Sequence, residues 1–158
     1  MKISFQIMAG IASLALLAGS HSMATEPEDS PYNADLAEKL GADEYGMRSY
    51  VFVTLLTGPA EITDADERNA LFRGHFSNMA KLAEDGKLVL AGPFIEGEPK
   101  RGLFIFDVKT VEEAQSLVET DPAVAAGIFK AEYTKYYGSA ALKMINDIHG
   151  TIQKTKIE

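Results

Sequence analysis

The sequence lacks cysteine and has few basic residues. None of its 158 residues is a cysteine, and 15 lysines and arginines stand against 23 aspartates and glutamates, for a net charge of −8. Without cysteine the chain has no disulfides, no thiolate nucleophile and no thiolate metal site. Nucleic acids and anionic membrane surfaces select basic patches, so this acidic balance argues against both as partners.

Histidine is also scarce, and its three copies lie far apart. His21, His75 and His149 form neither an HExxH motif nor a His-x-x-x-His pair, and we therefore expect no metal site. The chain has no phosphate-binding or dinucleotide-binding glycine motif, and none of its serines lies in a nucleophile-elbow motif. These absences predict a protein that uses neither a cofactor nor covalent catalysis.

The one long apolar run lies at the amino terminus. Residues 7–18 follow Lys2, and Ser22 and Ala24 occupy the −3 and −1 positions of a cleavage site. The run is shorter than the about 20 residues that a spanning helix needs. The pattern predicts a signal peptide over residues 1–24, and hence a periplasmic or secreted protein with no membrane association after cleavage. An uncleaved anchor is the alternative.

The rest of the chain has the length of one domain with short extensions. Residues 25–47 are expected to form an arm or linker, residues 48–138 the domain, and residues 139–158 a carboxy-terminal helical extension. Within the arm, Asn33 as a cap and Gly41 as a stop predict two helical turns.

Strand patterns and helix patterns alternate along the domain. Strand segments are rich in β-branched and aromatic residues, and the first long helix carries an apolar stripe that includes His75. The order β-α-β-β-α-β, followed by a carboxy-terminal helix, predicts a ferredoxin-like α+β sandwich. The expected elements are strands at 49–57, 88–92, 102–108 and 128–137, and helices from Thr63 or Asp64 to about Asp85, after the capping box Thr110–Glu113, from Asp121 to Gly127, and at 139–154.

Helices are expected to cover one face of this sheet and to leave the other open. The expected apolar residues of the open face are Val51, Val53, Phe104, Phe106 and Tyr133. A large exposed apolar surface is a liability in water, and pairing two sheets face to face would bury it. We therefore expect a homodimer.

Two long segments carry a resemblance to a known family. GHFSNMAKLAEDGKLVLAGPF contains His75, Gly92 and Pro93, and GLFIFDVKTVEEAQSLVETDPAVAAGIF contains Asp121. Together and in this order they resemble the YciI-like (YCII-related) family, over about residues 49–138. The resemblance implies a dimeric α/β-barrel type of fold, with one pocket per subunit that contains the family's histidine and aspartate.

The resemblance implies little about the reaction. Most members of the family have no established activity. One branch resembles a dehydrochlorinase of a chlorinated hydroxyquinol, in which the His–Asp pair would assist proton removal. The superfamily also includes lactone isomerases, cofactor-free monooxygenases and haem-degrading proteins, so the fold does not specify the reaction type.

His75 and Asp121 each have a structural and a functional interpretation. His75 is either a core histidine bonded to a backbone carbonyl or a general acid/base, since imidazole changes charge near neutral pH. Asp121 precedes a proline, so it is expected to cap a helix. Its second oxygen could still accept a bond from an imidazole and fix the tautomer, as in a triad without its nucleophile.

Other residues receive weaker assignments. Gly92 and Pro93 are expected to shape the turn after the second strand, and a glycine there could also let a substrate approach the backbone. Arg73 lies two residues from His75, so it should point elsewhere on the helix. The tyrosines of the last strand are expected to be ordinary strand residues, although one or two could line a pocket: Tyr133, Tyr136 and Tyr137.

The leading hypothesis is an exported dimer that binds an unknown small molecule. As an enzyme it would eliminate from or isomerise a small phenolic or enolisable compound, with His75 moving the proton, Asp121 orienting it, and the backbone near Gly92 and Pro93 holding the substrate. The first alternative is a non-catalytic binding or interaction protein in which the His–Asp pair is structural. The second is a haem-binding protein with His75 as the axial ligand.

Overall fold

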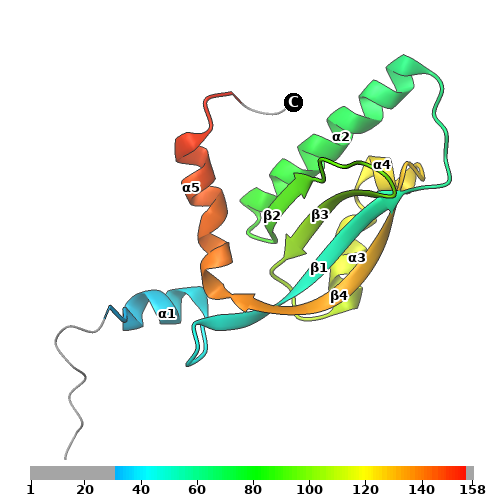
Figure 1. Ribbon diagram of the computed structural model, residues 1–158. Helices are drawn as coiled ribbons and strands as arrows, with labels where there is room; N and C mark the ends of the chain where they lie inside the picture. Colours follow the sequence, from blue (N-terminus) through cyan, green and yellow to red (C-terminus); the bar gives the residue numbers. More distant parts are fainter. Residues whose placement is uncertain (1–30, 156–158) are drawn as a thin grey trace, which may run out of the picture. The chain divides into compact units, whose positions relative to one another are not determined.

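The computed structural model describes residues 31–155, so the expected signal peptide lies outside the described part. The core of the fold is a four-stranded sheet in the order β2-β3-β1-β4, and every neighbouring pair is antiparallel (Figure 1). The strands are β1 (Met47–Thr57), β2 (Leu88–Pro93), β3 (Lys100–Phe106) and β4 (Phe129–Ser139).

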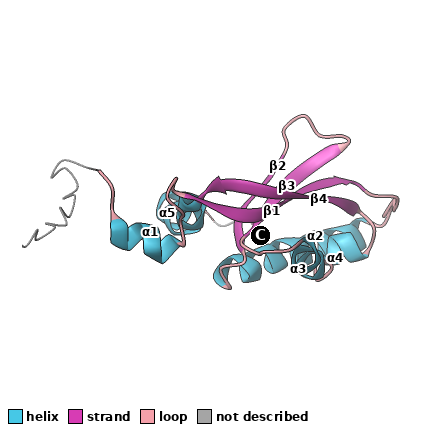
Figure 2. Ribbon diagram, turned by 90° about the horizontal axis from the view of Figure 1, so that it is seen from below, coloured by secondary structure: helices cyan, strands magenta, loops and turns pink. Residues whose placement is uncertain are grey.

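Three helices cover one face of the sheet. They are α2 (Ala65–Glu84), α3 (Val111–Val118) and α4 (Pro122–Ala125), and Figure 2 shows them together on the same side of the strands. The remaining helices are α1 (Ala34–Leu40), the 3₁₀ segment η1 (Ala140–Met144) and α5 (Ile145–Ile152). This α+β arrangement is compatible with the ferredoxin-like, dimeric α/β-barrel type of fold.

Helix ends follow the capping chemistry of the sequence. The Asn33 side chain accepts a bond from Leu36 at the start of α1, and Gly41 ends that helix with φ 66°, a backbone conformation that glycine adopts without strain. Thr110 and Glu113 form the expected capping box at the start of α3. These predictions are confirmed.

The assignment of apolar residues to the open face was wrong. Val51, Val53, Phe104 and Phe106 belong to the main core, which contains residues of α2 and α3, and Tyr133 packs against that core. Because β1 is apolar at successive positions, its pattern does not show which face the helices cover.

The opposite face, called the outer face below, has a smaller apolar cluster of its own. Tyr50, Val89 and Ile105 are buried there, with Phe52, Leu90, Leu103 and Leu142 packed against them. Burial raises the pKa of Tyr50 to about 12. Leu142 comes from η1, so the carboxy-terminal extension covers part of this face.

The carboxy-terminal extension is not the single helix at 139–154 that its pattern predicts. Strand β4 continues to Ser139, which pairs with Met47, and the Ala140 N–H donates to the Gly46 carbonyl at 2.9 Å. These bonds keep the chain extended up to Ser139, the 3₁₀ segment η1 follows over Ala140–Met144, and α5 begins only at Ile145. The Asn146 side chain then donates to the Leu88 carbonyl at 2.7 Å and ties α5 to β2.

The loop between β2 and β3 is also shorter than expected, because β2 ends at Pro93 and β3 starts at Lys100. Strand β3 starts at Lys100 and ends at Phe106, two residues earlier at each end than the predicted strand. The Phe94 N–H donates to the Arg101 carbonyl and the Thr57 N–H to the Pro99 carbonyl, both at 2.9 Å. These bonds place Arg101 inside the sheet rather than in a loop.

Across residues 31–155, none of the helices combines the length and apolar character that crossing a membrane requires.

Candidate functional site

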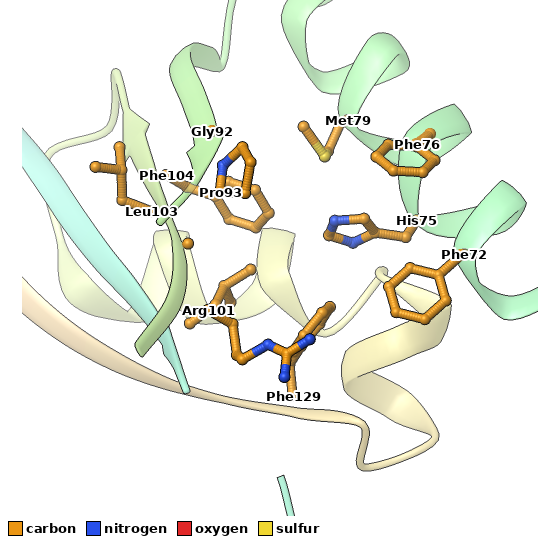
Figure 3. Close-up of a pocket in the computed structure, with 12 residues that line it drawn as sticks. Phe72, His75, Phe76, Met79, Gly92, Pro93, Arg101, Leu103, Phe104 and Phe129 are labelled. Carbon is orange, nitrogen blue, oxygen red and sulfur yellow. The ribbon is translucent and has the colours of Figure 1, made fainter. Parts of the chain in front are cut away.

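A cavity of about 190 Å³ lies between α2 and the sheet, with His75 in its wall (Figure 3). All four strands and α2 contribute to it, and most of the side chains are apolar. The lining residues are Leu55, Phe72, His75, Phe76, Met79, Gly92, Pro93, Arg101, Gly102, Leu103, Phe104 and Phe129.

His75 is held in place by aromatic rings. The His75 side chain is 9% exposed, and its ring centre lies 5.4–6.3 Å from the centres of four phenylalanine rings. Such packing restricts the rotamer of a side chain. The rings belong to Phe72, Phe76, Phe104 and Phe129.

The structure brings His75 and Asp121 together. His75 Nδ1 lies 2.5 Å from Asp121 Oδ2, although the two residues are 46 positions apart. Asp121 is 1% exposed, and its other oxygen, Oδ1, accepts the Ala123 N–H at 2.9 Å as the cap of α4. The carboxylate therefore makes both hydrogen bonds that the sequence suggested, one to the helix cap and one to the imidazole.

Close packing of α2 on α4 makes this contact possible. Gly74, the residue before His75, faces Pro122, and a Cβ atom at Gly74 would lie 2.9 Å from Pro122 Cγ. That is closer than carbon atoms approach without displacement. Gly74 is a residue whose role sequence reasoning missed, because nothing in the sequence shows that it faces Pro122.

The pair has the geometry of an oriented base. A carboxylate only accepts hydrogen bonds, so His75 Nδ1 carries the proton and donates a hydrogen bond to Asp121. Nε2 then has a free lone pair, and no hydrogen-bond partner for it occurs among residues 31–155. An imidazole in this tautomer can accept a proton from a molecule in the cavity.

Gly92 and Pro93 line the same cavity as His75, but they do not form the turn expected from the sequence. Both belong to β2, and they pair with Leu103 and Gly102. A Cβ atom at Gly92 would meet nothing within 4 Å. The glycine therefore leaves open space beside the strand instead of relieving a contact inside the protein.

The remaining sequence candidates lie away from the cavity. Arg73 is exposed and does not belong to the lining. Tyr133 packs against the main core, and burial raises its pKa. Tyr136 and Tyr137 are 40% and 52% exposed, and Tyr137 donates a hydrogen bond to Asp43.

Arg101 is the site residue that the sequence analysis did not single out. It supplies the one permanently charged side chain of the cavity lining, and its Nη1 lies 3.3 Å from Glu98 Oε1. The sequence placed Arg101 in a loop, and only the strand pairing shows that it reaches the cavity.

A metal centre is not apparent in the described region. Within residues 31–155, no three His, Asp or Glu side chains gather closely enough to hold an ion.

Comparison with known proteins identifies a protein family and similar solved structures. The model of the family described as YCII-related domain matches residues 51–134. No curated protein matches the chain. The 5-chloro-2-hydroxyhydroquinone dehydrochlorinase from Burkholderia phenoliruptrix AC1100, solved with 2,5-dihydroxybenzoquinone, is similar with 18% sequence identity and a TM-score of 0.41, over 54% of this chain and 92% of that chain.

Proposed function

The chain belongs to the YCII-related domain family, and on this premise we propose that it is an exported enzyme that moves a proton on a small molecule without a cofactor. His75 acts as the base and Asp121 as the residue that orients it. The substrate is a small phenolic or enolisable compound, held against Gly92 and Pro93, and the reaction is an elimination or an isomerisation.

The observation that carries this proposal is the 2.5 Å contact between His75 Nδ1 and Asp121 Oδ2. The contact fixes the imidazole with Nδ1 turned to the buried carboxylate, while the same ring forms part of the cavity wall. A histidine that only stiffened the fold would need no open space beside it. The combination of an oriented imidazole and a cavity is what proton transfer requires.

The proposed chemistry balances with these groups alone. In an elimination, Nε2 takes the proton from a C–H or O–H bond, and the electron pair of that bond forms the new double bond. The leaving group departs with its own bonding pair, as chloride would. The imidazolium formed is stabilised by the Asp121 carboxylate and returns the proton to water. In an isomerisation it returns the proton to another atom of the substrate.

The size of the cavity favours a single-ring substrate. An apolar cavity of about 150 Å³ is enough to bind benzene, and the volume here is about 190 Å³. Sites for drug-sized ligands measure about 300–1,000 Å³. The cavity is therefore better matched to a substituted ring than to a porphyrin, which argues against the haem alternative.

Chloride release from a chlorinated hydroxyquinol tests the proposal. We expect turnover by the wild type and a fall in kcat of about 10²–10⁴-fold in His75→Gln, the usual contribution of general acid–base catalysis. His149→Gln is the matched control, because His149 is exposed on α5, and it should keep full activity.

Two results would contradict the proposal. One is equal turnover by the wild type and His75→Gln. The other is absence of turnover combined with equal binding of the compound to both proteins, which would support the alternative of a binding protein with a structural His–Asp pair.

A further inference from the structure

Arg101 owes its position to an irregularity in the pairing of β1 and β3. Leu55 pairs with Gly102, but the next residue, Leu56, pairs with Lys100. Arg101 is thus an extra residue with no partner on β1, which defines a β-bulge. Bulges change the direction of a side chain and are frequent beside active sites.

The bulge brings a cation to an otherwise apolar cavity. Figure 3 shows the Arg101 side chain extending from β3 toward Phe129, on the opposite side of the cavity from α2, which carries His75. The whole chain has a net charge of −8, so its overall field repels anions. The positive charge of Arg101 therefore makes the cavity a place where an anion can be attracted despite the negative charge of the whole chain.

The present partner of Arg101 can be displaced. Glu98 Oε1 lies 3.3 Å from its Nη1, and the side chains of Arg101 and Glu98 are 39% and 69% exposed. An exposed ion pair of this kind contributes little to stability. The guanidinium also has five N–H donors in a planar fork, and the Glu98 contact uses one of them.

We propose that Arg101 selects substrates that carry an anionic group on their ring, either a carboxylate or an ionised phenol or enol. The anion binds the guanidinium in place of Glu98, and the apolar body of the ring lies among the phenylalanines that surround His75. This inference rests on the proposed function for the substrate site but concerns binding, so it can be tested without turnover.

The test compares two probes that differ in charge. Benzoate and benzamide have nearly the same shape, and their dissociation constants are measured by NMR titration of the full chain. For the wild type we expect a saturable benzoate site at Kd of about 10 mM or lower, with benzamide binding about tenfold more weakly, since hydrogen bonds to charged groups are the stronger ones. Phenol titrated above and below its own pKa distinguishes a phenolate from a carboxylate requirement.

Variants identify the residue responsible. Arg101→Gln should weaken benzoate by about tenfold and leave benzamide unchanged, whereas Arg68→Gln, an exposed arginine on α2, should change neither. Glu98→Gln removes the competing carboxylate and should strengthen benzoate binding by about twofold. Arg101→Met removes the charge but keeps a long unbranched side chain, and it serves if Arg101→Gln fails to fold.

Defined outcomes would overturn the inference. They are the absence of saturable benzoate binding, equal affinity for both probes, or benzoate binding that is unchanged in Arg101→Gln or, where that variant does not fold, in Arg101→Met. Failure here together with His75-dependent turnover would leave the proposed function intact. Arg101-dependent binding without turnover would support the inference on Arg101 and contradict the proposed function. The two failures are therefore distinguishable.

Discussion

Asp121 uses its two carboxylate oxygens for two separate purposes. Oδ1 caps α4 through the Ala123 N–H, and Oδ2 accepts from His75 Nδ1. The first bond is ordinary helix capping, which asparagine performs as well as aspartate. The second needs an acceptor at that position. A substitution that keeps the helix cap but removes the acceptor for Nδ1 therefore tests the His75–Asp121 pair, called the dyad below, rather than the helix.

Asp121→Asn is that substitution. The amide oxygen can keep the cap, but the NH₂ group then faces His75 and donates to it, so the imidazole proton moves from Nδ1 to Nε2. We expect kcat to fall by about 10²–10⁴-fold, by loss of the base, and stability to fall by about 1–3 kcal/mol, by loss of a charge-assisted bond. The ¹⁵N shifts of the imidazole would show the exchanged tautomer.

The matched control is Asp64→Asn at the cap of α2, where the Asp64 carboxylate accepts the Glu67 N–H at 2.8 Å and is exposed. It should change neither the tautomer nor kcat. An unchanged tautomer in Asp121→Asn would show that the carboxylate does not set the state of His75.

At the scale of elements, the dyad depends on how closely α2 approaches α4. Gly74 permits the approach, because a Cβ atom there would lie 2.9 Å from Pro122 Cγ. His75 is the next residue of α2, and Asp121 directly precedes Pro122. Any separation of the two helices at this point therefore lengthens the contact between His75 and Asp121.

Gly74→Ala tests this dependence. Alanine favours a helix interior by about 1 kcal/mol over glycine, but the overpacked contact with Pro122 costs about 1–3 kcal/mol. We expect a net loss of stability of up to about 2 kcal/mol, with partial exposure of His75 and lower turnover. Denaturant unfolding measures the first effect, and imidazole ¹⁵N shifts measure the second.

Gly150→Ala in α5 is the control, because a Cβ atom at Gly150 meets nothing within 4 Å. It should stabilise the protein by about 0.5–1 kcal/mol. Gly74→Ala with the same gain in stability and an unchanged dyad would show that Pro122 yields without moving α4.

The same scale shows which features the sequence could predict. Caps are local chemistry, so Asn33, Thr110 and Asp121 were assigned correctly from their neighbours. The face of a strand is decided by what packs on it, and β1 is apolar on both faces, so Val51 and Val53 were assigned to the wrong side.

For the site too, the sequence predicted some residues, whereas the roles of others depend on tertiary contacts. The resemblance to a family indicated His75 and Asp121, but their meeting depends on the fold. The roles of Gly74 and Arg101 depend on a helix contact and a bulge, and neither feature has a sequence pattern of its own.

At the scale of the whole molecule, the outer face of the sheet is the surface we expect a second copy of the chain to cover. Phe52 is only partly buried there, and its ring centre lies 6.4 Å from that of Tyr136, which is 40% exposed. Aromatic side chains are enriched in the buried centres of protein interfaces. A stable dimer of standard size would bury about 800 Å² per subunit.

Phe52→Glu is expected to break this dimer. A carboxylate at the centre of the interface would be desolvated without a partner, and losing a central aromatic residue costs about 2 kcal/mol or more, which raises the dissociation constant at least about 30-fold. Analytical ultracentrifugation over a range of concentrations should show a dimer for the wild type and a folded monomer for Phe52→Glu, with circular dichroism to check folding.

Ile95→Glu is the control, because Ile95 is 98% exposed in the hairpin after β2 and a new charge there should leave the dimer unchanged. A wild type that stays monomeric at every concentration, or a Phe52→Glu variant that remains dimeric, would contradict the assignment of this face.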